Sequence, residues 1–259
     1  PFFMYFAPGA THAPHQVAKE WSDNYRGKFD DGWDVLREKI VDRQKKLGVI
    51  PANADLTRRH DEIPAWDDMP ADLKPVLARQ MEIYAGFLEQ TDHEIGRVID
   101  AVDDLGVLDN TLIYYIIGDN GASAEGTING CFNEMTTLNG MPGIETTEFL
   151  LSKIDDFGTP DAYNHYAVGW AWAMNTPFQW TKQVASHWGG TRNGTLVHWP
   201  AGFTRSRRTR MASGRSWCTS DGTGEFWACR HTTSQRRCRK STSARSGSSP
   251  TPSAAVRTM

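Results

Sequence analysis

The sequence of 259 residues contains few cysteines and no long apolar run. Three of the four cysteines lie after residue 203, so Cys131 stands alone in the first 203 residues and has no partner there for an internal disulfide. The longest apolar run, residues 112–117, is far shorter than the ~20 residues that a membrane-spanning helix needs. Cysteine usage therefore says little about the compartment, and we expect no membrane span.

The sequence also lacks an initiator methionine and a charged segment ahead of its first apolar stretch. Pro1 leads directly into the apolar residues 2–6, whereas a secretory signal peptide carries a positively charged region before its apolar part. We find no signal peptide in this pattern. The expected organisation is that of an internal fragment of a longer protein.

Leucine and isoleucine are absent from residues 204–259, which contain a single valine. This segment carries 12 Lys and Arg against 2 Asp and Glu, whereas residues 1–203 carry 16 against 29. A basic segment ordinarily indicates nucleic acid or an acidic surface as partner. Because this one is rich in Ser, Thr and Arg and has little apolar surface to offset the entropy of ordering, we expect a disordered tail and no nucleic-acid partner. Its composition is typical of an altered reading frame; the alternative is a natural disordered basic tail.

The apolar run 112–117 ends abruptly in Gly118-Asp119-Asn120-Gly121. This pattern predicts a buried strand with a carboxylate and a carboxamide at its C-terminal end, where open α/β sheets place their chemistry. Asp119 and Asn120 offer the hard oxygen ligands that Ca²⁺ and Mg²⁺ prefer. Two oxygens do not complete a shell of six to eight ligands, and the same residues also form ordinary turns.

The clearest predicted element is an amphipathic helix that begins near Ala71 and ends before Gly106, a natural C-cap. Its apolar residues recur at helical spacing: Leu77, Met81, Tyr84, Leu88, Ile95, Val98, Ile99, Val102 and Leu105. A helix that returns into a parallel strand is the building unit of an α/β sheet, which is the fold class we expect. Residues 1–6 are expected to form a further buried strand, and residues 17–46 a partly helical scaffold.

Two cationic or titratable groups accompany the strand-end oxygens. His12, with His15, lies in the loop 7–15, and is a ligand, an acid/base group or a surface residue. Lys182 either presents a fixed positive charge to an anion or solvates the surface. The aromatic residues of the segment 163–180 either line a pocket for a flat substrate or pack in the core. A divalent cation, a lysine and a histidine together form a clamp for sulfate or phosphate esters.

Five motifs in order resemble the type I sulfatases of the alkaline phosphatase-like superfamily, and in detail the bacterial arylsulfatases. The resemblance covers residues 1–203, which we interpret as a partial sulfatase catalytic domain. The matching segments are 1–5 running to Thr11-His12-Ala13-Pro14, 92–97, Asp109-Asn110-Thr111 into 118–121, Thr176-Pro177-Phe178 before Lys182, and 189–192. The fold implied is an α/β/α sandwich with a central, mostly parallel sheet.

The resemblance also implies roles for four residues. Asp119 and Asn120 match two ligands of the catalytic divalent cation, usually Ca²⁺ and alternatively Mg²⁺. His12 matches the histidine that contacts the sulfate ester oxygen, and Lys182 the lysine that binds sulfate and neutralises the leaving group. The implied nucleophile is a formylglycine made from Cys or Ser in the motif Cys/Ser-x-Pro-x-Arg. That motif is absent from this sequence, and the surroundings of Cys131 do not match it.

We therefore expect a chain from a metal-dependent sulfuric ester hydrolase that carries the second half of the active site. Its partner would be a small-molecule sulfate ester, most simply an aryl sulfate. The alternatives are a catalytically inactive fragment and a phosphodiesterase or phosphonate hydrolase of the same superfamily. The compartment, bacterial cytoplasm or periplasm, stays open.

Overall fold

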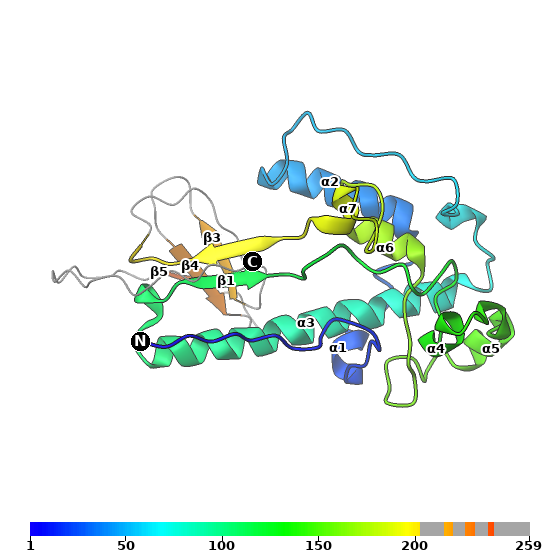
Figure 1. Ribbon diagram of the computed structural model, residues 1–259, viewed down its shortest axis with the longest axis horizontal. Coiled ribbons are helices and arrows are strands. Elements are labelled where there is room, and N and C mark those ends of the chain that lie inside the picture. Colours follow the sequence, from blue (N-terminus) through cyan, green and yellow to red (C-terminus); the bar gives the residue numbers. More distant parts are fainter. Residues whose placement is uncertain (203–214, 220–225, 231–237, 241–259) are drawn as a thin grey trace.

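The computed structural model describes residues 1–202 and, beyond them, the backbone of residues 215–219, 226–230 and 238–240. In the first part, one long helix runs alongside a small sheet, and the other helices lie beyond one end of that sheet (Figure 1). The longer helices are α2 (Gly32–Leu47) and α3 (Lys74–Asp104), and the shorter ones are α1 (Lys19–Asp23), α4 (Glu134–Leu138), α5 (Thr147–Ser152), α6 (Val168–Met174) and α7 (Trp188–Thr191). Short 3₁₀ turns are η1 (Trp66–Asp68), η2 (Leu108–Asn110) and η3 (Pro142–Ile144). The combination is that of an α/β chain.

Helix α3 confirms the predicted amphipathic helix. Pro75 lies in its first turn, where the missing backbone N–H costs nothing, and Gly106 follows its end with a φ of 70°. Leu77 is fully buried and Ile99 nearly so, whereas Leu105 at the end of the periodic pattern is exposed. Helical spacing therefore identified the element, and packing decided which of its apolar residues are buried.

Strand β1 (Ile113–Ile116) follows α3 through η2, as the sequence predicted. It pairs with β2 (Thr195–His198) in antiparallel register, from Ile113 opposite His198 to Ile116 opposite Thr195. The expected parallel pairing is therefore wrong for the sheet in residues 1–202. One face of β1 packs on α3, while the other is exposed, so the strand is only half buried.

The segment 1–6 corrects a second prediction. These residues form no strand, and Figure 1 shows them as an extended trace. Among the described residues no strand pairs with them, and Phe3 and Tyr5 are 69% and 80% exposed. β-propensity reflects packing and pairing with neighbours, so an apolar run without a ladder partner does not become a strand.

The main core lies between α2, α3 and α6. Trp33, Trp66 and Trp170 meet in edge-on or tilted ring contacts at centroid distances of 4.9 to 5.5 Å. Trp170 and Trp172 from the aromatic segment 163–180 are buried, which confirms the core interpretation for these residues. Trp170 and Trp172 of this segment therefore pack in the core.

Arg37 of α2 fixes the chain that follows α6. Its side chain is buried and stacks on Trp172 at 4.2 Å from the ring centroid. It donates hydrogen bonds to the carbonyl oxygens of Trp172 (2.7 Å) and Phe178 (2.9 Å), and to Thr57 Oγ1 (2.6 Å). A single buried guanidinium thus satisfies several backbone acceptors just ahead of Lys182.

The predicted disordered tail mostly lies outside the described residues. Three strands are described there, β3 (Arg215–Thr219), β4 (Phe226–Arg230) and β5 (Cys238–Lys240), and they pair antiparallel in the order β3-β4-β5. No helix among the described residues is long and apolar enough to cross a membrane.

Candidate functional site

Three segments meet beyond the end of β1. Lys182 donates its backbone N–H to the carbonyl oxygen of Ala122 at 2.9 Å, and Gly121 donates to Gly190 of α7 at 3.1 Å. The Ala122 N–H also donates to Asn175 Oδ1 at 2.9 Å. The loop after β1, the chain around Lys182 and α7 are therefore held against one another by backbone hydrogen bonds.

Glycine at two positions permits this contact. A Cβ at Gly121 would lie 1.6 Å from the carbonyl oxygen of Gly189, and a Cβ at Gly189 would lie 2.0 Å from the carbonyl oxygen of Gln179. Both distances are far below van der Waals contact, so any larger residue would separate the segments. Close backbone approach therefore explains Gly121 and Gly189 of the sequence motifs.

His12 and Lys182, which are 170 positions apart, come together here. The Nζ of Lys182 lies 3.4 Å from Nε2 of His12, and Nδ1 of His12 lies 2.9 Å from the carbonyl oxygen of Ala13. An ammonium group only donates and a carbonyl only accepts, so this geometry favours the neutral imidazole with its proton on Nδ1. The lone pair of Nε2 then faces Lys182.

Glu125 is the carboxylate partner of this lysine, and sequence reasoning missed it. Lys182 Nζ donates to Glu125 Oε2 at 3.0 Å, Ser123 Oγ donates to the same oxygen at 2.6 Å, and Gln183 Nε2 donates to Oε1 at 2.9 Å. Burial raises the pKa of Glu125, but the hydrogen bonds from Ser123 and Lys182 outweigh it, so the pKa lies below its ordinary value. Glu125 and Lys182 also line a cavity of about 120 Å³.

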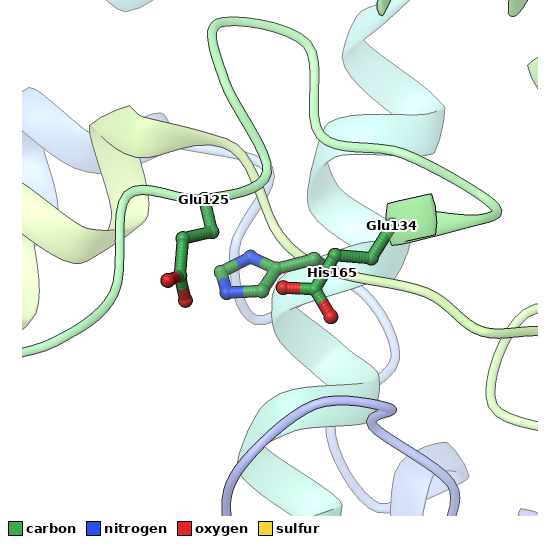
Figure 2. Close-up of side chains that lie close together, drawn as sticks. All are labelled: Glu125, Glu134 and His165. Atoms are coloured by element: carbon green, nitrogen blue, oxygen red, sulfur yellow. The ribbon is translucent and has the colours of Figure 1, made fainter. Parts of the chain in front are cut away.

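Glu134 and His165 lie beside Glu125, as Figure 2 shows. One ligand atom from each of the three side chains falls within 4.8 Å of the others. Burial raises the pKa of Glu134, as does the charge of Glu125, and burial lowers the pKa of His165 to about 4. Each of these residues is isolated in the sequence, and no local pattern singles it out; the one available signal is the nearness of Glu125 to the Asp119-Asn120 motif.

Backbone pairing explains why these residues meet. Cys131 and His165 exchange both backbone hydrogen bonds, at 3.0 and 3.1 Å, and Glu134 donates its N–H to the carbonyl oxygen of Tyr163 at 2.7 Å. Gly126 lets the Glu125 loop approach, since a Cβ there would lie 2.0 Å from the carbonyl oxygen of Tyr166. The cluster therefore forms because the chain around residues 163–166 contacts both the segment 131–134 and the Glu125 loop.

Asp119 and Asn120 lie where the sequence predicted, directly after β1, with Asp119 exposed and Asn120 partly exposed. Asn120 Nδ2 donates to Asp119 Oδ1 at 2.8 Å. Their two oxygens have the hardness that Ca²⁺ or Mg²⁺ requires, and they fit part of a coordination shell. The backbone N–H of Lys182 is bonded to Ala122, two residues after Asn120, so the chain around Lys182 lies beside the loop that carries Asp119 and Asn120.

Two other residues considered in the sequence have different surroundings. His15 is buried, with 1% of its surface exposed, and its ring stacks on Tyr166 at a centroid distance of 5.0 Å. It is therefore not a surface residue. Cys131 is also buried, and burial together with the charge of Glu145 raises the pKa of its thiol to about 12. A thiol that stays protonated is a poor nucleophile, which agrees with its lack of a motif.

Comparison with known proteins gives a consistent result. A family model described as sulfatase matches residues 1–216. The chain is 33% identical over 211 residues to an uncharacterized sulfatase of Schizosaccharomyces pombe, covering 77% of this chain and 34% of that protein. It is 27% identical over 207 residues to an arylsulfatase of Klebsiella aerogenes, covering 79% of this chain and 41% of that protein. The chain thus spans about a third to two fifths of the length of these curated relatives.

Proposed function

Because the chain belongs to the sulfatase family, with an alkaline phosphatase-like α/β fold, we propose that it supplies part of the active site for metal-dependent hydrolysis of sulfate esters. The products would be an alcohol or phenol and sulfate. The observation that carries the proposal is the 3.4 Å approach of Lys182 Nζ to His12 Nε2, on a segment bonded to the loop that bears Asp119 and Asn120.

Lys182 and His12 would have complementary roles. The ammonium group of Lys182 would bind a sulfate oxygen and stabilise the negative charge that develops as the ester bond breaks. His12 Nε2, the ring nitrogen that faces the lysine, would contact the ester oxygen, and would have to take up a proton itself before it protonates the leaving group. The cavity of about 120 Å³ that Lys182 and Glu125 line is far below the ~300 Å³ of sites for larger ligands, so its size suits a small ligand.

Asp119 and Asn120 would hold the divalent cation, with Ca²⁺ favoured and Mg²⁺ as the alternative. The cation supplies positive charge that stabilises the oxygens of the ester. The formylglycine nucleophile that the resemblance implies, and the remaining cation ligands, are expected from parts of the protein outside this chain. The chain by itself is therefore expected to be inactive, with an aryl sulfate as the simplest substrate of the whole protein.

The experiment measures turnover of nitrophenyl sulfate and nitrophenyl phosphate by the parent protein and by the purified chain 1–259. We expect the parent to prefer the sulfate and the chain alone to be inactive. Lys182→Ala in the parent should lower kcat/KM by about 10²–10³-fold, the usual effect of losing one group that stabilises developing negative charge. Lys153→Ala is the matched control, because Lys153 is a partly exposed lysine whose ammonium forms an ion pair with Asp156, three residues further along the chain.

Three outcomes would contradict the proposal. Preference for the phosphate would reassign the protein to phosphoester hydrolysis. Turnover by the chain 1–259, abolished by Asp119→Ala, would show that the fragment is complete for catalysis. Equal activity of Lys182→Ala and Lys153→Ala would show that Lys182 has no role in catalysis.

A further inference from the structure

The cluster of Glu125, Glu134 and His165 has the donor composition of a transition-metal site, unlike the oxygen-only pair Asp119 and Asn120. The three ligand atoms lie within 4.8 Å of one another. Shifts of about 1 Å by each side chain would place every one of these atoms ~2.0–2.2 Å from an ion at the centre of the cluster, the distance of zinc ligands. Figure 2 shows the two carboxylates on either side of the imidazole.

His165 is held in the form that a metal requires. Its Nδ1 lies 2.9 Å from the carbonyl oxygen of Tyr166, and a carbonyl only accepts, so the proton sits on Nδ1. Nε2 therefore keeps its lone pair. Histidines that bind metals ordinarily donate the other ring N–H to a carbonyl or carboxylate in this way, which fixes the ring and its tautomer.

Glu134 supplies an independent observation. Its residue is only 4% exposed, and its carboxylate lies near enough to Lys182 and His12 to interact with both electrostatically. Buried charged groups are ordinarily paired with an opposite charge or coordinated to a metal, because leaving them unpaired is costly. The side chain points toward His165 and Glu125, where a cation would satisfy it.

We propose that Glu125, Glu134 and His165 bind a Zn²⁺ ion, with a fourth position left for water. Carboxylate oxygen and imidazole nitrogen are both zinc ligands, and three protein ligands leave the fourth tetrahedral position open for water. The site is separate in chemistry from the Ca²⁺ or Mg²⁺ position at Asp119 and Asn120, which lacks a nitrogen ligand.

Zinc at this cluster competes with Lys182 for Glu125. The lysine Nζ lies 3.0 Å from Glu125 Oε2, and the ion pair is about one fifth exposed. A dication bound to the same carboxylate repels the ammonium group. Replacing the lysine with methionine should therefore tighten zinc binding, by roughly three- to tenfold, as loss of a competing and partly screened charge implies.

The experiment titrates Zn²⁺, and Co²⁺ as a spectroscopic probe, into the metal-free chain 1–259 with excess Ca²⁺ present. The cysteines are alkylated first, because Cys218, Cys229 and Cys238 are alternative zinc ligands in the sequence. We expect one ion per chain and a Co²⁺ spectrum without thiolate charge-transfer absorption. Glu134→Gln should weaken binding by about 100-fold or more, since even the loss of a residue that only hydrogen-bonds to a metal ligand costs 10–100-fold.

Two variants keep the outcome decisive. Circular dichroism would show whether Glu134→Gln folds. If it does not, Glu125→Gln replaces it, because Glu125 lies on a partly exposed loop, and this variant should also weaken zinc binding. Asp119→Asn should leave zinc affinity unchanged. Absence of stoichiometric binding, or equal affinity of the unchanged chain and Glu125→Gln, would overturn the proposal; loss of zinc binding in Asp119→Asn would place the ion elsewhere and overturn it too.

Discussion

The free energy of unfolding at acidic pH tests whether the buried imidazoles near the site are neutral in the folded protein. His165 is 1% exposed, and burial lowers its pKa from 6.5 to about 4, despite opposing contributions from Tyr166 and Glu125. The pKa of His15 is also lowered, by burial first and then by repulsion from His165 and His12. Both imidazoles are therefore neutral in the folded protein at neutral pH.

The sign of the effect follows from proton uptake. The unfolded chain protonates these imidazoles near 6.5, before the folded chain does, so the free energy of unfolding falls as the pH falls from about 6.5 toward 4. For His165 alone the shift corresponds to ~3 kcal/mol in total, of which ~2 kcal/mol is lost by about pH 5. His15 acts in the same direction, while Glu134, whose pKa is raised, opposes it.

The assay is urea unfolding of the chain 1–259 at about pH 7, 6 and 5, in the presence of a chelator. The loss between pH 7 and pH 5 should be on the order of 2 kcal/mol, and His165→Gln should reduce that loss whatever its stability at pH 7. His60→Gln, at an exposed residue, is the control that should keep the full dependence. An equal loss in His165→Gln and the unchanged chain would refute the reasoning.

Three further substitutions test the framework by the same unfolding measurement. Arg37→Met should destabilise by ~3 kcal/mol because it leaves buried carbonyls unsatisfied, whereas Arg58→Met, at an exposed ion pair, should cost less than ~1 kcal/mol; equal effects would contradict this. Gly121→Ala should cost roughly 3 kcal/mol, since its Cβ would lie 1.6 Å from a carbonyl oxygen of α7, and a neutral result would disprove the close contact. Tyr115→Phe removes a 3.0 Å hydrogen bond to a carboxylate of α3 and should cost ~1 kcal/mol or more; no change would mean that water replaces it.

The periodic elements were predictable because their signals are local. Residues at helical spacing defined α3, and a β-branched and aromatic run ending in glycine defined β1. The position of Asp119 and Asn120 just after this strand was predictable for the same reason. The pairing of β1 with β2 was not predictable, because a strand sequence does not specify which distant segment completes its ladder.

The segment 1–6 shows the limit of local reasoning. Its apolar and aromatic residues have the composition of a strand, yet in the structure they are exposed and unpaired. Strand formation depends on neighbours that the segment itself cannot supply. The prediction was wrong because propensity was treated as sufficient.

By itself the sequence determined the helix α3, the strand-end oxygens and the ordered motifs that include His12 and Lys182. Only the tertiary structure decided that Lys182 is paired with Glu125 and that Glu134 and His165 lie beside it. These contacts depend on a backbone bridge between Cys131 and His165 and on loops brought close by glycines. Side chains that meet across such separations leave no periodic trace in the chain, because their positions are fixed by three-dimensional packing.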